Sequence, residues 1–193
     1  TFNKELKKNK LEISYKIQSR ADLLVAEDTI VSLAESGLKE VWIGAESGSQ
    51  KILDAMDKGT TIEQIKSSTE QLKGLGVRVA YFIQFGYIGE TEEDIDLTLK
   101  MIKDYKPDDV GVSVSYPLPG TVFYEKVKED LKLKANWNDS DELAMLFTGT
   151  FNSEYYKTLH RYLHKIFRTS QGKQFLLQFI RLSKWNMISW RTL

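Results

Sequence analysis

Hydrophobic segments of two different periods alternate along the chain up to residue 131, and this alternation is what most constrains the fold. Four short apolar runs, near residues 12–19, 40–45, 77–86 and 109–115, have the character of strands. They are separated by segments whose apolar residues recur at helical spacing. Strands that alternate with helices of this length form βαβ units, so the sequence predicts an α/β fold with a parallel sheet.

Helix start and stop signals support the helical segments between these strands. Thr60 lies three residues before Glu63, which predicts a capping box, and Gly74 and Gly76 close the same helix. Acidic residues in the first turn favour the helix that begins at Thr91. We expect helices at residues 2–9, 21–36, 49–56, 60–76, 91–105 and 121–133.

The character of the chain changes after Pro117, and we divide it into residues 1–131 and a helical extension, residues 132–193. An irregular stretch with scattered aromatics is followed by a long helical pattern from Ser153 and then by a second one, GKQFLLQFIRL. The extension has a surplus of Lys and Arg. Either it packs on the α/β body with its basic residues solvated, or an amphipathic face docks a missing domain or a partner.

Composition excludes several classes of function. The chain has 193 residues, enough for a real core, and 27 basic residues balance 27 acidic ones, so nothing general points to a nucleic-acid partner. No apolar run is long enough for a membrane span and the charged start is unlike a signal peptide, which makes the cytoplasm the expected location. Cysteine is absent, which excludes disulfides, thiol nucleophiles and cysteine-ligated clusters within these residues.

Polar residues, glycines and prolines follow each predicted strand, where parallel α/β folds bind ligands. The segment WIGAESGSQ, residues 42–50, places Glu46 at the end of an apolar run. A carboxylate only accepts hydrogen bonds, so it suits ribose hydroxyls, an ammonium group or a metal. It could instead cap the helix near Ser49 or pair with Arg20. The flanking Gly44 and Gly48 favour a ligand, because glycine lets backbone amides approach it closely.

Three segments, in this order and spacing, resemble the second half of a radical S-adenosylmethionine domain. They read WIGAESGSQKILDAMDKGTT, FIQFGYIGETEEDIDLTLKMI and SVSYPLPGTVFYEKV, and the resemblance covers about residues 10–130. The likeness is greatest to the cobalamin-associated branch that includes anaerobic ring cyclases and methylases. It implies a partial (β/α)6 barrel whose third to sixth strands are the four above.

The resemblance also implies a chemistry. In the family, a CxxxCxxC loop binds a [4Fe–4S] cluster that holds S-adenosylmethionine, and one-electron reduction yields a 5′-deoxyadenosyl radical. That cysteine motif is missing here, and the chain begins at Thr1 without a methionine. We therefore expect a C-terminal fragment of an iron–sulfur enzyme of the oxidoreductase or methyltransferase type, with cobalamin as an optional cofactor. The fragment itself is expected to be inactive.

The family's cofactor-binding positions map onto the ends of the four strands. Glu46 and Ser47 match the ribose site, and Ile88 stands where the family usually has proline, which loosens a preset backbone angle. The full set implied for S-adenosylmethionine is Arg20, Glu46, Ser47, Gln84, Gly86, Ile88, Gly89, Tyr116, Pro117 and Pro119. Arg20 would neutralise the methionine carboxylate, and Gln84 would touch cofactor or substrate at the same rim.

Other readings stay open at this point. The strand ends suit a cluster-free α/β module that binds a nucleotide-like ligand, and the helical tail suits an interaction domain. His160 and His164 lie four apart, but two ligands do not complete a metal site and we predict that they pack or face solvent. We expect an unidentified small-molecule substrate, no nucleic acid, no membrane span, no catalytic side chain in this part, and self-association through an exposed barrel edge.

Overall fold

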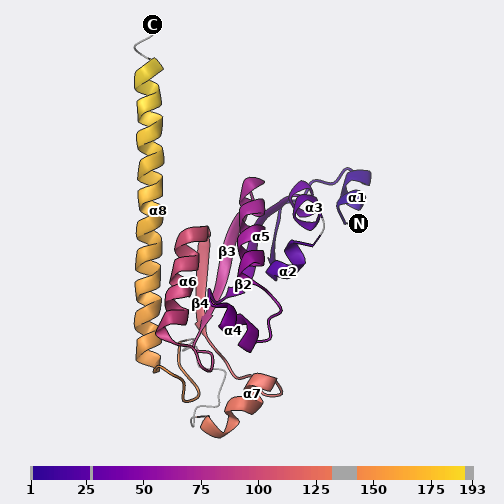
Figure 1. Ribbon diagram of the computed structural model, residues 1–193. Coiled ribbons are helices and arrows are strands. Elements are labelled where there is room, and N and C mark those ends of the chain that lie inside the picture. The colour runs from indigo at the N-terminus through magenta and orange to yellow at the C-terminus, as the bar shows by residue number, and fades with distance from the viewer. Residues whose placement is uncertain (1, 27, 132–142, 190–193) are drawn as a thin grey trace. The chain divides into compact units, whose positions relative to one another are not determined.

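A computed structural model describes residues 2–26, 28–131 and 143–189, the last helix by its backbone alone beyond residue 172 (Figure 1). It divides into two compact units, residues 1–156 and 157–193. The predicted boundary after residue 131 adjoins residues 132–142, which lie outside the described residues, so that boundary stays a prediction. None of the helices in the described ranges has the length and apolarity that a membrane crossing requires.

The first unit contains a four-stranded parallel sheet, as the alternating pattern predicts. Its strands are β1 (Tyr15–Ser19), β2 (Leu38–Glu46), β3 (Arg78–Phe85) and β4 (Asp109–Val114), in the spatial order β1-β2-β3-β4. β1 begins three residues later than predicted. Its neighbour β2 starts at Leu38, opposite Tyr15, so the residues before Tyr15 have no strand to pair with.

The helices largely follow the predicted ones, with three corrections. The helix predicted over residues 121–133 ends at Val127 and is followed by a 3-10 turn. The segment 21–36 forms two helices rather than one, and the chain from Ser153 forms a single helix rather than two. The helices are α1 (Phe2–Lys8), α2 (Ala21–Leu24), α3 (Thr29–Glu35), α4 (Gln50–Ala55), α5 (Ile62–Gly74), α6 (Glu92–Tyr105), α7 (Val122–Val127) and α8 (Ser153–Ser189), with a 3-10 turn at Lys128–Asp130.

The capping box of α5 lies one residue later than predicted. Thr61 accepts a hydrogen bond from the backbone of Gln64, whose side chain accepts one from the backbone of Thr61. Thr60 is buried instead, and its hydroxyl donates to Asp22. The helix therefore begins where the threonine hydroxyl is still available to cap it.

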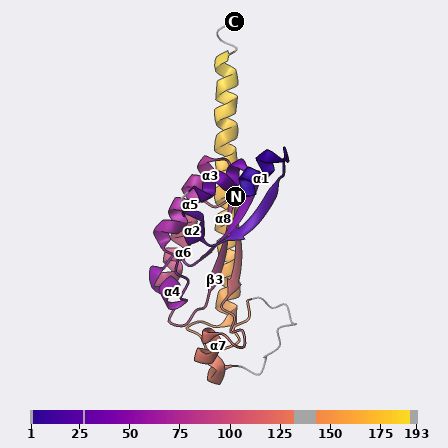
Figure 2. The same ribbon diagram turned by 90° about the vertical axis from the view of Figure 1, so that its right-hand side faces the viewer.

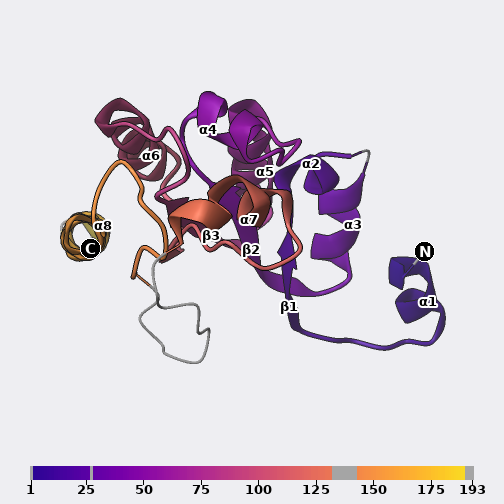
Figure 3. The ribbon, with the colours of Figure 1, turned by 90° about the horizontal axis from the view of Figure 1, so that it is seen from below.

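The two faces of the sheet have different neighbours. Side chains alternate along β2, and Val41, Ile43 and Ala45 are completely buried. Figure 3 shows the helices α2 to α6 all on one side of the strands. On the opposite face the rings of Trp42 and Phe82 contact each other in a tilted arrangement, with centroids 4.7 Å apart. A sheet with one covered face and one open face is expected when only part of a (β/α) barrel is present.

The loop after β2 is fastened to α6 by buried contacts. Ser47 Oγ lies 3.2 Å from Thr98 Oγ1, and the backbone nitrogen of Gly48 donates to the same oxygen at 2.9 Å. A Cβ built on Gly48 would lie 2.3 Å from the carbonyl oxygen of Leu97. Gly48 is therefore glycine because the backbone of α6 passes too close for any side chain.

Two glycine substitutions test this packing. Gly48→Ala forces a methyl group against backbone that cannot rotate away, so we expect the free energy of unfolding to fall by about 1–3 kcal/mol. Gly74→Ala, at the end of α5, meets nothing within 4 Å and should leave stability unchanged or raise it by up to about 1 kcal/mol. Urea unfolding of both variants measures the difference. Equal stability of the two would contradict the close approach at Gly48.

Candidate functional site

Glu46 ends β2 in a backbone conformation that few residues other than glycine adopt. Its φ is +57°, and the backbone nitrogen of Ser47 donates to the carbonyl of Ala45 at 2.7 Å, which closes a tight turn around it. The β2–β3 register also shifts between Gly44 and Glu46. A bulge and a left-handed residue at a strand end re-aim a side chain, and both cost conformational energy. Such strain is typical of functional positions.

The Glu46 carboxylate folds back over its own strand. A Cβ built on Gly44 would lie 3.1 Å from Glu46 Oε1, so Gly44 leaves room for this carboxylate. That Gly44 and Gly48 admit a ligand to the backbone stays a prediction. Both glycines make room for groups of the chain itself, one for Glu46 and the other for α6.

Lys58 is the ion-pair partner of Glu46, with Nζ 3.0 Å from Oε1. The Glu46 side chain is 16% exposed, so it is sheltered but reachable from solvent. Neither alternative weighed from the sequence applies. Ser49 caps α4 without a side-chain hydrogen bond, and Arg20 forms a two-point ion pair with Asp22, at 2.9 Å for each contact.

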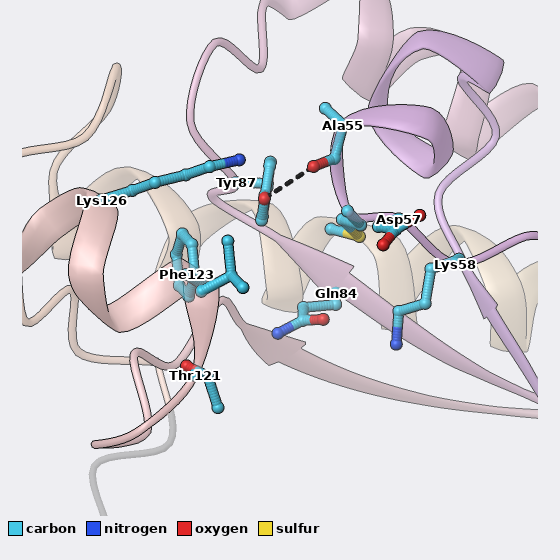
Figure 4. Close-up of a pocket in the computed structure, with 10 residues that line it drawn as sticks. Ala55, Asp57, Lys58, Gln84, Tyr87, Thr121, Phe123 and Lys126 are labelled. Atoms are coloured by element: carbon cyan, nitrogen blue, oxygen red, sulfur yellow. Dashed lines mark hydrogen bonds between the residues drawn. The ribbon is translucent and has the colours of Figure 1, made fainter.

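A pocket of about 330 Å³ lies beside this ion pair, between the end of α4 and the start of α7 (Figure 4). Figures 1 and 2 show both helices at the same end of the sheet, where the strands finish. The residues around the pocket are Ala55, Met56, Asp57, Lys58, Gln84, Tyr87, Thr121, Val122, Phe123 and Lys126. Two cations, polar groups and aromatic rings therefore share one cavity.

Tyr87 forms one wall of the pocket. Its hydroxyl donates to the carbonyl of Ala55 at 2.8 Å, which joins the β3 loop to α4. Its ring stacks on Phe123 of α7, with centroids 4.9 Å apart and planes 21° apart. The two rings thus connect the loops that follow β2, β3 and β4 and give the pocket a rigid, flat and apolar side.

The loop after β3 contains a completely buried carboxyl group, Glu90. Its Oε2 accepts from the backbone nitrogen of Gly86 at 2.7 Å and from the Tyr156 hydroxyl at 3.3 Å, while Oε1 has no partner within the described residues. Burial raises the pKa of Glu90 to about 7, against the lowering effect of these hydrogen bonds. Glu90 therefore holds the turn at Gly86 from inside the protein.

A second buried carboxylate, Asp94, joins the loops after β2 and β3. It accepts from Ser49 Oγ at 2.7 Å, from Lys51 Nζ at 2.6 Å, and from the backbone and hydroxyl of Thr91 at 2.9 and 2.8 Å. Burial alone would raise the pKa of Asp94, but the hydrogen bonds from Lys51, Ser49 and Thr91 outweigh it and hold that pKa well below its usual range. The hydrogen bonds of Asp94, together with those of Thr98, fix the segment that contains Glu46.

The segment after β4 closes the rim. The backbone nitrogen of Ser115 donates to the carbonyl of Phe85 at 2.7 Å, and Ser115 Oγ is buried without a partner within the described residues. Pro117 is buried, whereas Pro119 is exposed. Ser115 Oγ and Glu90 Oε1 are thus two buried polar atoms, in the segments after β4 and β3, that have no hydrogen-bond partner within the described residues.

The structure brings some of the predicted site residues together and separates others. Glu46 and Gln84 lie at the ion pair and the pocket, but Ser47 is buried against Thr98, which gives it a structural contact. The remaining predicted residues, Arg20, Gly86, Ile88, Gly89, Tyr116, Pro117 and Pro119, lie in the segments that follow β1, β3 and β4. Their contact with a cofactor stays a prediction.

Of the residues around the pocket, sequence reasoning assigned only Gln84 to the site, and those that it missed include Lys58, Tyr87, Phe123 and Lys126. Lys58 precedes Gly59 directly after α4, and a lysine just past a helix end is usually explained by the helix dipole or by solvent. Tyr87 lies within the motif that resembles the family, but only the residues on either side of it were assigned. No local signal identifies Phe123 and Lys126, which reach the pocket through the packing of α7.

A metal centre has no support among the described residues. They contain no group of three or more His, Cys, Asp or Glu side chains able to hold a metal ion. His160 and His164 contact each other, with ring centroids 4.4 Å apart, in the helical unit of residues 157–193. The 193 residues contain no cysteine, so none of them fits as a thiolate ligand of an iron–sulfur cluster.

The raised pKa of Glu90 predicts a pH-dependent stability. An unfolded glutamate titrates near 4.5 and the folded one near 7, so only the folded chain keeps this proton between those pH values. The free energy of unfolding should therefore fall, by about 3 kcal/mol from this group, as pH rises from 4.5 to 7. Glu90→Gln cannot ionise and should lack this component in urea unfolding from pH 5 to 8.

Tyr156→Phe provides a control for the Glu90 prediction. It removes a hydrogen bond that lowers the pKa of Glu90, so the pH window should move upward rather than disappear. Parallel stability curves for the wild type and Glu90→Gln would show that Glu90 is not the titrating group.

Comparison with known proteins identifies the family. The radical SAM superfamily model matches residues 2–102. The chain is 30% identical over 133 residues to the anaerobic magnesium-protoporphyrin IX monomethyl ester cyclase of Rubrivivax gelatinosus, with 68% of the chain and 24% of the relative covered. The first curated relatives it matches are covered over only 24–29% of their length, so the chain corresponds to about a quarter of such a protein.

Solved structures agree on the fold. The archaeal Methanocaldococcus infernus Elp3 superimposes with a TM-score of 0.54 at 28% identity, over 58% of this chain and 27% of that one. The radical S-adenosylmethionine methyltransferase TsrM from Kitasatospora setae, with cobalamin and a [4Fe–4S] cluster bound, gives 0.52 at 18% identity, over 61% and 24%. The chain belongs to the radical SAM superfamily, and its four-stranded sheet is part of that superfamily's barrel.

Proposed function

We propose that this chain forms the nucleoside side of the S-adenosylmethionine site of a radical SAM enzyme. The observation that carries the proposal is Glu46, a carboxylate held in a left-handed conformation at a strand end, beside a pocket. A chain gains no stability from such a conformation. A carboxylate that accepts two ribose hydroxyls explains why glutamate stands where glycine would fit better.

The pocket suits the adenine base. Tyr87 and Phe123 give it a flat aromatic side, and Gln84 offers an amide that both donates and accepts. In this proposal the backbone at Gly86, Ile88 and Gly89 and the segment from Tyr116 to Pro119 line the path of the base. Ser47 supports the loop from behind through its contact with Thr98, and its own contact with the ligand stays a prediction.

The cluster is held elsewhere, because this chain has no thiolate to hold it. When S-adenosylmethionine and a reduced [4Fe–4S] cluster are bound together, they supply one-electron chemistry at the sulfonium. The role of the residues described here is to bind and orient the nucleoside. Arg20 is proposed for the methionine carboxylate, but its present two-point pair with Asp22 has to open first.

For the substrate and the further cofactors we propose only a chemical class and a candidate. A small-molecule substrate is consistent with the cyclase relative and with the fold shared with TsrM, and the TsrM likeness also makes cobalamin a candidate cofactor. An enzyme of the oxidoreductase or methyltransferase type fits both. A cytoplasmic location and self-association through an exposed barrel edge remain predictions.

The binding role of Glu46 is tested by Glu46→Gln. The amide keeps the size of the side chain but loses the charge that hydroxyl donors prefer, so we expect the affinity for S-adenosylmethionine to fall at least about tenfold. Isothermal titration of the chain measures this. Glu40→Gln is the matched control, because Glu40 lies on the same face of β2 and pairs with Lys16 and Arg78 instead. An equal loss of affinity in Glu46→Gln and Glu40→Gln would count against the assignment of Glu46 to the ribose.

A second variant separates binding from stability. Glu46→Gly relieves the strain of the left-handed backbone but removes the ion pair with Lys58. The two effects on the free energy of unfolding have opposite signs and are each about 1 kcal/mol. We expect urea unfolding to show unchanged or slightly higher stability, while nucleoside binding is lost. A stability loss well above 1 kcal/mol would mean that Glu46 is kept for folding and not for a ligand.

A further inference from the structure

Lys58 occupies the position that the ligand has to take. Its ammonium lies 3.0 Å from Glu46 Oε1, and the same residue lines the pocket. The proposed ribose contact needs the oxygens of Glu46 as acceptors. Ligand hydroxyls and Lys58 therefore compete for one carboxylate.

The backbone that carries Lys58 is fixed by the end of α4. The backbone nitrogen of Lys58 donates to Leu53 at 3.2 Å and that of Asp57 donates to Asp54 at 3.0 Å, a Schellman motif. Asp57 takes the left-handed position with φ +54°, and Gly59 follows with φ +62°. Two left-handed residues around Lys58 turn the chain sharply and direct its side chain toward Glu46.

The side chain of Lys58 can still leave Glu46. It is 38% exposed, and a lysine stem rearranges easily while its charged head stays in water. In Figure 4, Asp57 and Lys58 leave the loop in different directions, and Lys126 approaches the pocket from the opposite side. A displaced Lys58 ammonium is therefore well placed to meet an anionic group that enters with the ligand.

We infer that Lys58 is a specificity-determining residue of this site. It holds Glu46 while the pocket is empty, competes with a neutral nucleoside for that carboxylate, and yields to a nucleoside whose side chain brings its own carboxylate. The inference rests on the proposed nucleoside site and goes beyond it. It makes the site selective for an amino-acid-bearing nucleoside over the neutral nucleoside that remains after the amino acid is lost.

The test uses two probes that differ in the amino acid but not in the nucleoside. S-adenosylhomocysteine has a carboxylate but no sulfonium charge. 5′-Deoxyadenosine has neither a carboxylate nor a sulfonium charge. Lys58→Gln removes the competitor, so the affinity for 5′-deoxyadenosine should rise about three- to fivefold, the range of a partly exposed ion pair. The affinity for S-adenosylhomocysteine should not rise, because its carboxylate loses the cation that the displaced Lys58 supplies in addition to Arg20. The ratio of the two dissociation constants should therefore shrink at least about threefold.

Lys128→Gln is the matched control, since it removes the same charge from an exposed lysine that pairs with Glu125 outside the pocket. It should leave both affinities unchanged. Glu46→Gln is titrated in parallel, and thermal unfolding by circular dichroism shows that every variant is folded.

The outcomes separate the two proposals. If Glu46→Gln loses binding but Lys58→Gln leaves the affinity for 5′-deoxyadenosine unchanged or lower, the role of Lys58 is overturned and the nucleoside site stands. If Glu46→Gln binds as the wild type does, or no variant binds either probe, the nucleoside site itself is overturned and the inference falls with it.

Discussion

The contact on which the site most depends is the buried carboxylate of Asp94 at the start of α6. It accepts hydrogen bonds from Ser49 and Lys51, which follow β2, and from Thr91, which follows β3. Of these donors, Ser49 is buried, so without Asp94 its hydroxyl would lose its hydrogen-bond acceptor at a cost of about 1–3 kcal/mol. One acidic side chain therefore sets the distance between two loops that are 40 residues apart in sequence.

This fixed arrangement is what allows Glu46 to be strained. Its left-handed backbone opposes folding, yet the residues on either side are anchored, Ala45 in the sheet and Ser47 against Thr98. A strained residue persists only where its surroundings over-determine it. The anchors lie on the covered side, and the strain appears on the open side, where the carboxylate and the pocket are.

The architecture could be predicted from the sequence because it depends on local periodicity. Four strands, most helices and the parallel sheet follow from alternation and from end signals such as Thr91 and Gly74. The break after Leu24 and the shifted cap at Thr61 could not be predicted from local sequence. They depend on which residue from elsewhere in the chain bonds to a threonine hydroxyl or packs against a helix face. Tertiary contacts decide such details over local propensity.

The site was predictable only where a motif marks it. Glu46 could be found because a carboxylate at the end of an apolar run is unusual, and family resemblance added the β3 and β4 loops. Lys58 and Phe123 could not, since each reaches the pocket from a helix end whose direction no local pattern encodes. The reason for Gly44 was also hidden, because its missing side chain accommodates Glu46, two residues later in the same strand.

Two carboxyl groups at this rim illustrate how surroundings assign roles to the same side chain. Glu90 is completely enclosed, and desolvation raises its pKa to about 7, so it keeps its proton at pH values where an exposed glutamate is ionised, and it joins Gly86 and Tyr156 from inside the protein. Glu46 is partly open and has the partly exposed cation of Lys58 as its partner. A ligand that replaces this cation exchanges one set of donors for another and leaves no buried charge unpaired. No such exchange is open to Glu90, because solvent cannot reach it. Of these two acids, only Glu46 is placed to bind a ligand without first disrupting the fold.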